Sequence, residues 1–292
     1  MESCIAFIGF GEAAAAFVGG SPRAHVYDLK TDAAETRAAK LADYARHDVI
    51  GVSSAAEAVR DAGVVLSLVT ADQALLAARH MAGLLRAGAL WLDMNSVAPD
   101  TKRAAAQAIE AAGGGYVDVA VLAPVHPQRL AVPLLVSGPH ADAGAAQLRS
   151  IGFTNIRIIA GEVGKASAIK MIRSVMVKGL EALTAEWILA AEAAGIRDEA
   201  VAALDANWPG TDWAARADYN LERMMVHGIR RAAEMEEAVK TLDALGTGSA
   251  MTRGTVQRQR ALGTLAYAAP ASLDDKLALL LGKDKPGNKE AA

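Results

Sequence analysis

The feature that most constrains this chain is a glycine-rich motif near its start. A short apolar strand, residues 4–9, runs directly into G-x-G-x-x-A over residues 9–14, and the next apolar stretch ends in Asp28, 19 residues after Gly9. This order of strand, glycine turn, helix and acid is the fingerprint of a dinucleotide-binding βαβ unit. The alternative interpretation is a glycine turn in an α/β protein of another kind.

Each position of the motif has a physical task. Gly9 permits the tight turn, Gly11 lets backbone approach the pyrophosphate, and Ala14 lets helix and strand pack closely. The phosphates would lie at the helix N-terminus, where free N–H groups and the dipole favour anions. Asp28 stands at the spacing at which a carboxylate meets the adenosine ribose diol. The cofactor-binding residues predicted from this motif are Gly9, Phe10, Gly11, Glu12, Ala13 and Asp28.

Composition fits a soluble enzyme of about two domains. The chain has 292 residues and a formal net charge of −3, which gives no electrostatic reason to bind nucleic acid. Its single cysteine, Cys4, cannot form an internal disulfide. No signal-peptide pattern begins the chain, and no apolar run approaches the about 20 residues of a membrane helix. We therefore expect a cytoplasmic protein that contacts neither membrane nor nucleic acid.

Strand-like and helix-like segments alternate through the first half of the chain. Residues 64–69 are apolar almost throughout, as in a strand covered on both faces. A capping box, Ser54-x-x-Glu57, begins the helix after the third strand. The alternation predicts an α/β Rossmann domain, a doubly wound parallel sheet with right-handed crossovers, over residues 1–162. The predicted strands cover residues 4–9, 24–28, 49–52, 64–69, 89–93, 116–120, 134–138 and 155–159.

The second part of the chain has a helical pattern. From residue 163 to 194 apolar residues recur at steps of three and four without a proline, which predicts one helix of about 30 residues, roughly 45 Å long. Further helices follow, with breaks at residues 208–210 and 246–248. We therefore predict an all-α domain over residues 163–292, opened by the long helix. Because one small domain cannot cover so long a helix, we expect a homodimer whose helical domains pack together.

Three further motifs follow the fingerprint. Residues 93–101 read D-M-N-S-V-A-P-D-T, residues 116–118 read Y-V-D, and residues 161–170 read G-E-V-G-K-A-S-A-I-K. With the domain order, they resemble the β-hydroxyacid dehydrogenase superfamily, which includes 3-hydroxyisobutyrate, tartronate semialdehyde and 6-phosphogluconate dehydrogenases. That family carries D-x-S-T-x-x-P or N-S-x-x-x-D-T, then F-L-D, then G-x-x-G-x-x-x-x-x-K at the corresponding places.

The resemblance implies an NAD(P)-dependent oxidoreductase that moves a hydride between a nicotinamide cofactor and a β-hydroxy acid or related alcohol. It makes Lys170 the general acid/base, because a half-buried lysine beside a positive nicotinamide has a depressed pKa and can take the hydroxyl proton. Ser174, at i+4, would donate to the substrate oxygen. Lys165 and Lys178 are competitors, about 140° and about 80° from Lys170 around the helix. The alternative for Lys170 is an ordinary surface lysine.

Two departures from the family pattern concern the small-molecule substrate. The family continues D-A-P-V-S-G-G, and its S-G-G loop grips the substrate carboxylate. Residues 118–124 here read D-V-A-V-L-A-P, so Leu122 brings no hydroxyl and Pro124 no N–H. The family has an asparagine four residues after the lysine, whereas this chain has Ser174 there. Both changes indicate a divergent branch of the family. Analogy with the family therefore does not identify its substrate.

Other candidates have competing interpretations. Asn95 and Ser96 end a strand on the edge where ligands bind in such sheets, or they cap the following helix. Thr70 and Ala71 flank the nicotinamide ribose, or Thr70 is a helix N-cap. His227 forms a substrate-anion patch with Arg223 and Arg230, or belongs to a solvated face that Glu234 continues. The substrate candidates are Asn95, Ser96, Leu122 and His227, and the cofactor candidates also include Thr70, Ala71 and Asn95.

Cofactor and reaction remain open at this stage. Asp28 favours NAD because a carboxylate repels a 2′-phosphate, while Lys30 leaves room for NADP. No His, Cys, Asp or Glu cluster has metal-ligand spacing, so no metal is predicted. Imine reductases share the architecture and often lack the lysine, so Lys170 favours alcohol chemistry. A non-catalytic NAD(H)-binding sensor is the alternative from another class.

Overall fold

The computed structural model describes residues 4–20 and 24–282 of the chain. They divide into two compact units, Met1–Met171 and Ile172–Ala292. The sequence pattern places the boundary after residue 162, where the long helix is predicted to begin. The contacts within the structure instead divide the helix itself, because its first turns pack with the first unit.

The first unit is built on an eight-stranded sheet with the order β3-β2-β1-β4-β5-β6-β7-β8. Strands β1 to β6 are parallel, and the strand order reverses between β1 and β4. Every predicted strand overlaps an observed one, and all of β4 is buried. The strands are β1 Cys4–Ile8, β2 His25–Tyr27, β3 Ile50–Gly51, β4 Ala62–Ser67, β5 Leu90–Asp93, β6 Gly115–Val121, β7 Leu134–Ser137 and β8 Ile156–Ile158.

The predicted doubly wound parallel sheet is confirmed, with one exception at β7. This strand pairs antiparallel with β6, with Val119 opposite Val136. The reason lies in the connection, since a parallel pair needs a crossover, usually a helix, to return the chain to the same edge. Residues 122–133 contain only a 3₁₀ turn, η4 (Arg129–Ala131), so the chain reverses directly. A helix does separate β7 from β8, and these two strands are parallel.

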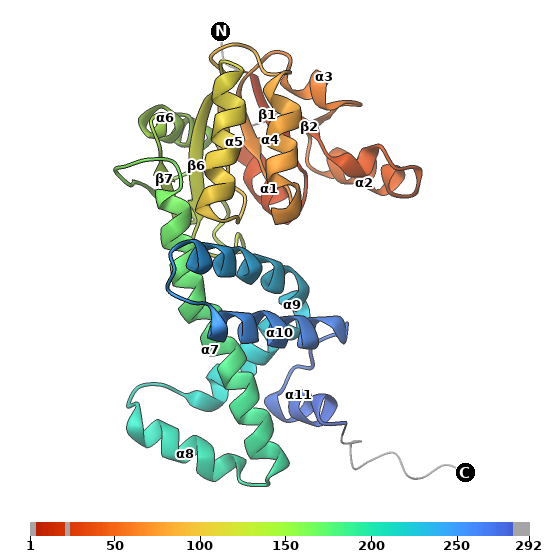
Figure 1. The fold of residues 1–292 in the computed structure, drawn as a ribbon. Coiled ribbons are helices and arrows are strands. Elements are labelled where there is room, and N and C mark those ends of the chain that lie inside the picture. Colours follow the sequence, from red (N-terminus) through yellow and green to blue (C-terminus); the bar gives the residue numbers. More distant parts are fainter. Residues whose placement is uncertain (1–3, 21–23, 283–292) are drawn as a thin grey trace, which may run out of the picture. The chain divides into compact units, whose positions relative to one another are not determined.

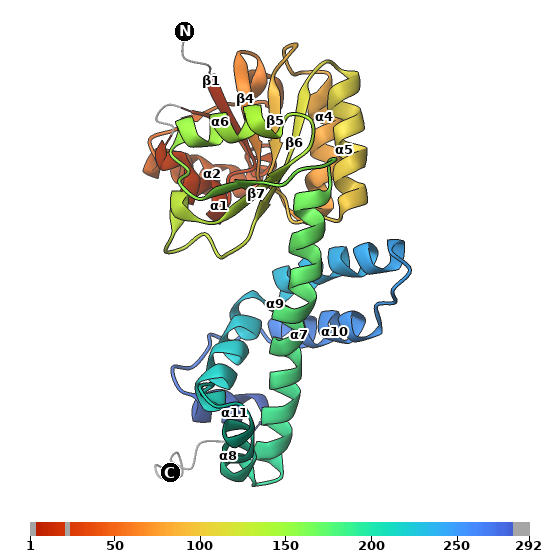
Figure 2. The ribbon, with the colours of Figure 1, turned by 90° about the vertical axis from the view of Figure 1, so that its left-hand side faces the viewer.

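Helices cover both faces of the sheet (Figures 1 and 2). Side chains alternate between the faces along each strand, so Phe7 packs in one core while Ala6 and Ile8 pack in the other. Helices α1, α2 and α6 contribute to the first core, and α3, α4 and α5 to the second. Their bounds are α1 Glu12–Phe17, α2 Ala34–Arg46, α3 Ala55–Val59, α4 Ala74–Ala82, α5 Pro99–Ala111 and α6 Ala141–Ile151.

The predicted capping box at the start of α3 is half formed. The Ser54 hydroxyl accepts a hydrogen bond from the Glu57 N–H at 3.2 Å, as an N-cap residue does. The Glu57 carboxylate accepts from the N–H and hydroxyl of Ser53, at 3.1 and 3.0 Å, one residue earlier than the motif predicts. The helix start is therefore stabilised by both side chains.

Five helices follow the sheet, and the first, α7, matches the predicted long helix. The breaks predicted at residues 208–210 and 246–248 both fall between helices. In the second unit Gly228 and Gly263 let α9 and α10 cross closely, because a Cβ on Gly228 would lie 2.3 Å from the Gln259 carbonyl oxygen. The helices are α7 Lys165–Ala193, α8 Arg197–Asn207, α9 Trp213–Ala244, α10 Ala250–Thr264 and α11 Leu273–Leu280.

Candidate functional site

The glycine turn lies at the carboxyl end of β1, beside the point where the strand order reverses, which is where open α/β sheets bind ligands. Gly9 has φ +86°, and a Cβ there would lie 2.5 Å from the Leu68 carbonyl oxygen. Its N–H donates to the Tyr27 carbonyl oxygen at 2.8 Å. The fold itself therefore requires glycine at this position.

Gly11 is different, because nothing in the fold requires it. It is the N-cap of α1 with φ −100°, which any residue can adopt, and a Cβ there would meet no atom within 4 Å. The space above this backbone is open, and Glu12 beside it is exposed while Ala13 is half-buried. A glycine without a structural reason fits a backbone that a ligand must approach closely.

Phe10 contributes to this loop through its backbone. Its side chain is fully buried and packs edge-on against Tyr44, with ring centroids 5.2 Å apart. Its N–H donates to the Asp28 carboxylate at 2.7 Å, and the other oxygen of Asp28 accepts from the Lys30 N–H at 2.9 Å. Asp28 is half-buried at the end of β2, so these bonds hold its carboxylate beside the glycine loop.

Sequence reasoning missed Lys40, which lies on α2. Its Nζ donates to the Phe10 carbonyl oxygen at 2.6 Å and pairs with Asp43 at 2.8 Å. Hydrogen bonds from Lys40 and then Arg46 lower the pKa of Asp43. The charge of Lys40 is thus balanced by an acid, and its structural effect is to fix the glycine loop. No local signal points to it, since it is 30 residues from Phe10.

The ends of β4 and β5 carry the next candidates. Thr70 is exposed at the N-cap position of the 3₁₀ helix η3 (Ala71–Gln73), but its side chain makes no capping bond. Hydrogen bonds from Thr70 and then Gln73 lower the pKa of Asp72. Ala71 is half-buried. Thr70 therefore occupies the N-cap position of η3, but its hydroxyl does not cap the helix.

Asn95 is buried and ties two strand ends together. Its Oδ1 accepts from the Val69 N–H at 2.7 Å, and its Nδ2 donates to Ser67 at 2.9 Å and to Asp93 at 2.8 Å. The neighbouring Ser96 hydroxyl is buried without a hydrogen-bond partner within the described part of the chain. The interpretation of either residue as the cap of α5 was wrong, because the N-cap is Ala98 and lacks a capping side chain.

A buried ionic cluster lies below this edge, and the sequence did not reveal its lysine. Lys102 is 0% exposed, and its Nζ donates to Asp93 at 2.9 Å and lies 3.6 Å from Asp118. The Tyr116 hydroxyl donates to the second oxygen of Asp93 at 2.7 Å. Burial, followed by the charge of Asp93, raises the pKa of Tyr116 well above its ordinary value. The two motif acids, Asp93 and Asp118, are thus bridged by one cation.

The three lysines of α7 have different environments. Lys165 is exposed at the first position of the helix, while Lys170 is half-buried. Lys178 is buried and forms an ion pair with Glu234 at 2.7 Å. Ser174, one turn beyond Lys170, is 5% exposed. Lys178 therefore has a structural role in the helical unit, and Lys170 differs from both competitors.

The altered substrate loop begins at the end of β6. Leu122 packs against the small cluster of Ala120, Leu135 and Ala166, and its N–H donates to the Pro133 carbonyl oxygen at 2.9 Å. His126 is exposed in a turn. The loop is thus held by apolar packing at the position where the family pattern has a hydroxyl.

On α9, the basic stripe is partly neutralised. Arg230 pairs with Glu234 at 3.0 Å, and the same acid binds Lys178. His227 is half-buried on this helix and Arg223 also. Glu234 thus balances part of the positive charge, which favours the interpretation of a solvated face over that of an anion site.

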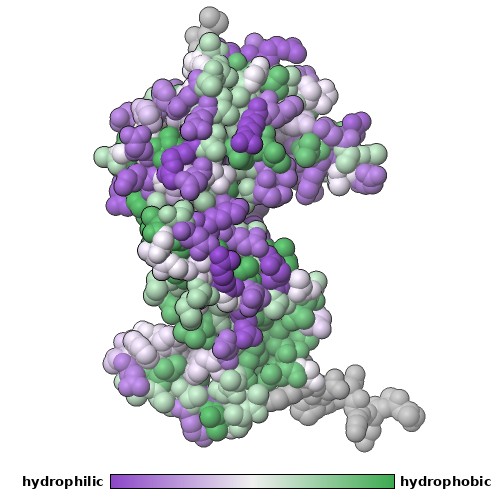
Figure 3. Space-filling view, in the orientation of Figure 1, coloured by the Kyte–Doolittle hydropathy of each residue, from purple (hydrophilic) through white to green (hydrophobic). Residues whose placement is uncertain are grey.

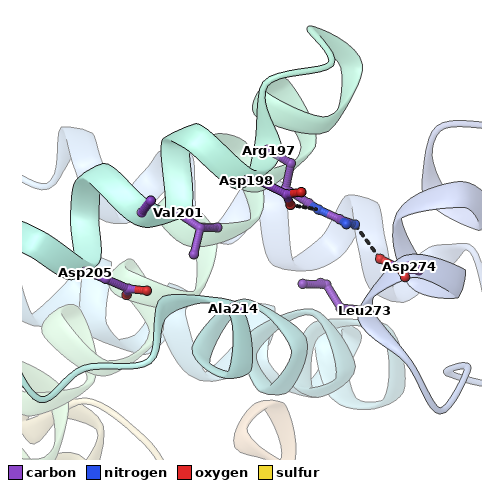
Figure 4. A pocket seen from close by; sticks show the side chains of 8 residues that line it. Arg197, Asp198, Val201, Asp205, Ala214, Leu273 and Asp274 are labelled. Carbon is purple, nitrogen blue, oxygen red and sulfur yellow. Dashed lines mark hydrogen bonds and ion pairs between the residues drawn. The ribbon is translucent and has the colours of Figure 1, made fainter.

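The second unit also has a hollow between α8, α9 and α11 (Figure 4). Arg197 lies along it and forms ion pairs with Asp274, Asp198 and Glu192. None of the candidate site residues lines this hollow, and of its acids Asp205 accepts a hydrogen bond from the Trp213 N–H. Over residues 4–20 and 24–282, no group of His, Cys, Asp or Glu could hold a metal ion. Within the same ranges, no helix combines the length and the apolarity that a membrane span requires.

Comparison with known proteins matches both parts of the chain. Residues 4–148 match the NAD binding domain of 6-phosphogluconate dehydrogenase, and residues 191–262 match a domain of unknown function, DUF1932. A conserved hypothetical protein from Sinorhizobium meliloti 1021 is 36% identical, with 97% of each chain covered and a TM-score of 0.75.

Two further solved structures are similar. MTH1747, a conserved protein of unknown function with structural similarity to 3-hydroxyacid dehydrogenases, is 28% identical, with 89% of this chain and 98% of that one covered and a TM-score of 0.66. The 3-hydroxyisobutyrate dehydrogenase of Mycobacterium tuberculosis, solved with L-serine, is 19% identical, with 96% and 99% covered and a TM-score of 0.70. The fold therefore extends over nearly the whole chain.

Proposed function

Because the chain belongs to the β-hydroxyacid dehydrogenase superfamily, we propose that it is an NAD(P)-dependent oxidoreductase acting on a β-hydroxy acid or a related alcohol. The observation that carries this proposal is the glycine loop. Gly9 is required by the turn, Gly11 is left open toward solvent, and Asp28 is held at the loop by the Phe10 N–H. These residues would hold the dinucleotide, together with Thr70 and Ala71.

The bound nicotinamide would supply hydride acceptance or delivery. The chain must then move the proton of the substrate hydroxyl, and we assign this to the neutral amine of Lys170. Its half-buried position supports the assignment over Lys165, which is exposed, and over Lys178, which is buried. Ser174 would donate a hydrogen bond to the substrate oxygen from one turn further along α7.

Asp28 makes NAD the preferred cofactor in this proposal. A 2′-phosphate would meet a carboxylate that already accepts two backbone hydrogen bonds and cannot turn away without breaking them. Lys40 would not compensate, because it is paired with Asp43. The side chain of Lys30 is exposed two residues after Asp28, so NADP binding is a measurable alternative.

The substrate residues in this proposal are Ser96 and Leu122, with Asn95 as the residue that orders the strand edge. The unpartnered Ser96 hydroxyl supports its role, because a buried polar group without a partner is unfavourable unless a ligand satisfies it. Leu122 indicates a substrate with an apolar group at the place where the family loop binds a carboxylate. His227 is not part of this proposal, because Glu234 partly neutralises its helix face.

We also propose a homodimer formed through the helical unit. Large apolar side chains are exposed on two of its helices, and Figure 3 shows hydrophobic surface, in green, on this unit. A contiguous apolar surface on a folded chain usually marks an interface. Sedimentation at micromolar concentration should give a dimer, and a stable monomer would contradict the proposal. The exposed residues are Ile172, Met176 and Leu183 on α7 and Tyr219, Val226 and Ile229 on α9.

The decisive experiment is a screen of hydroxy acids, amino alcohols and cyclic imines, read at the nicotinamide absorbance band. On an alcohol found in this way, Lys170→Ala should lower kcat roughly 10²–10⁴-fold while the affinity for NAD stays near wild type. Lys165→Ala is the matched control and should change little. Full turnover by Lys170→Ala would make an imine reductase-like chemistry the leading interpretation, and NAD binding without any turnover would favour the sensor.

A further inference from the structure

The start of α7 is capped from a distance. Gly164 precedes the helix and has no side chain that could cap it. The Lys165 N–H donates to the Glu162 carbonyl oxygen at 3.3 Å, and the neighbouring N–H groups find their acceptors on distant residues. The Asp118 carboxylate of β6 accepts from the Gly164 N–H at 3.0 Å and from the Ser167 N–H at 3.1 Å. The Ser137 hydroxyl of β7 accepts from the Ala166 N–H at 3.0 Å. Two neighbouring strands thus provide the cap.

Asp118 is the centre of this arrangement. One of its oxygens accepts the two helix N–H groups and also the Ser137 hydroxyl at 3.0 Å, and the other accepts the Ser167 hydroxyl. Asp118 is 0% exposed, so these bonds are shielded from water. A carboxylate at a helix N-terminus is also stabilised by the helix dipole. Removal of this one group would leave several buried donors without acceptors.

The same carboxylate is linked to the strand edge that carries Asn95. Lys102 lies between Asp118 and Asp93, and the Asn95 N–H and amide both donate to the Asp93 oxygen that binds Lys102. Asn95 in turn accepts from the Val69 N–H. One continuous chain of bonds therefore connects the ends of β4 and β5 with the first turn of α7.

Packing fixes the other side of this turn. Gly164 has φ +101°, and a Cβ there would lie 2.7 Å from a guanidinium nitrogen of Arg103 and 3.0 Å from Pro99 Cβ. The first turn of α5 thus presses against the first turn of α7 where only glycine fits. Between this contact and the Asp118 cap, the helix start has little freedom to rotate or slide.

We propose that Asp118 is the positioning residue for Lys170. Lys170 follows Ser167 by three residues, which places it about 60° short of one full turn around α7 and about 4.5 Å along it. The bonds that fix Ser167 therefore fix the direction in which the Lys170 side chain leaves the helix. The inference rests on the proposed function for the role of Lys170, whereas the anchoring of α7 by Asp118 stands apart from it.

The test uses the full-length variant Asp118→Asn. Asparagine keeps one acceptor oxygen and replaces the other by a donor, so it cannot accept all the hydrogen bonds that Asp118 receives. Hydrogen exchange of the amides in residues 163–170 should become at least tenfold faster, while the amides of α9 keep their rates. The matched control is Asp142→Asn, because Asp142 is an exposed acid in the first turn of α6.

Two further measurements address Lys170 itself. The first is labelling with trinitrobenzenesulfonate, read by mass spectrometry. The extent of labelling at Lys170, divided by that at Lys165 in the same molecule, should rise or fall at least threefold. With the alcohol identified by the screen, kcat of Asp118→Asn should fall at least tenfold while Kd for NAD stays within twofold. If Asp118→Asn only destabilised the fold, the folded fraction would fall. The labelling of Lys170 relative to Lys165 would then stay unchanged, and kcat would not fall separately from the affinity for NAD.

Unchanged hydrogen exchange in Asp118→Asn would overturn the anchoring role. Faster exchange with an unchanged labelling ratio and kcat would overturn the positioning of Lys170. If Asp118→Asn does not fold, Ser137→Ala removes the acceptor of the Ala166 N–H and one of the hydrogen bonds to Asp118, and it should show the same changes at smaller size. Full turnover by Lys170→Ala would end the proposed function, and the exchange result would still decide the anchor.

Discussion

Replacing Gly9 by alanine should destabilise the nucleotide-binding unit, whereas replacing Gly11 by valine should leave it folded and unable to bind NAD. The two glycines are two residues apart, yet their backbones differ. Gly9 has φ +86°, and its missing Cβ would lie 2.5 Å from the Leu68 carbonyl oxygen. Gly11 has φ −100° and an open position.

The magnitude for Gly9→Ala follows from these contacts. The left-handed conformation costs an L-residue about 1–2 kcal/mol. The clash forces the Leu68 peptide to move, which weakens the bond from its N–H to the Ile8 carbonyl oxygen, worth about 1 kcal/mol. The total is roughly 2–3 kcal/mol, or a fall in Tm of roughly 4–12 °C for a domain of this size. For Gly11→Val the change in stability should stay within about 1 kcal/mol.

Thermal unfolding followed by circular dichroism measures the first effect, and calorimetric titration with NAD measures the second. Gly83→Ala is the control, since Gly83 has φ −75° and open space around its Cβ position, so alanine there should be neutral or slightly stabilising. Wild-type affinity for NAD in Gly11→Val would refute the assignment of the loop. A wild-type Tm in Gly9→Ala would refute the geometry of the turn.

Three further changes give separable outcomes. Asp28→Ser should weaken NAD and improve NADP in kcat/KM, and an unchanged ratio would place Asp28 outside the ribose site. Ile172→Glu puts a charge on an exposed apolar position of α7 and should shift sedimentation toward monomer; an intact dimer would locate the interface elsewhere. Ser54→Ala removes the cap of α3 and should lower stability by about 1 kcal/mol in thermal unfolding, whereas no change would show that Glu57 suffices.

Local patterns determined the elements of this protein. The alternation of apolar residues predicted all eight strands, and the three- and four-residue steps predicted α7, because side-chain periodicity is set by the backbone geometry of each element. The glycine motif also predicted which residues turn the chain at Gly9. These features depend on neighbours in sequence, and a single chain therefore contains the information to read them.

The direction of β7 was not determined in this way. A strand pattern has the same period in both directions, so the pairing depends on how the connection of residues 122–133 packs. The substrate candidates show the same limit. The sequence correctly placed Asn95 at a strand end. Only the structure showed that its side chain forms hydrogen bonds with Val69, Ser67 and Asp93.

By itself, the sequence determined the order of the elements, the nucleotide loop and the helix that carries Lys170. Only the tertiary structure decided which distant polar groups meet: Lys40 on the Phe10 carbonyl, Lys102 between two acids, and Asp118 at the start of α7. Lysines and aspartates at these positions look like surface residues in sequence, because charge alone does not reveal burial. They become recognisable once the sheet brings their partners within hydrogen-bond distance in a space without water.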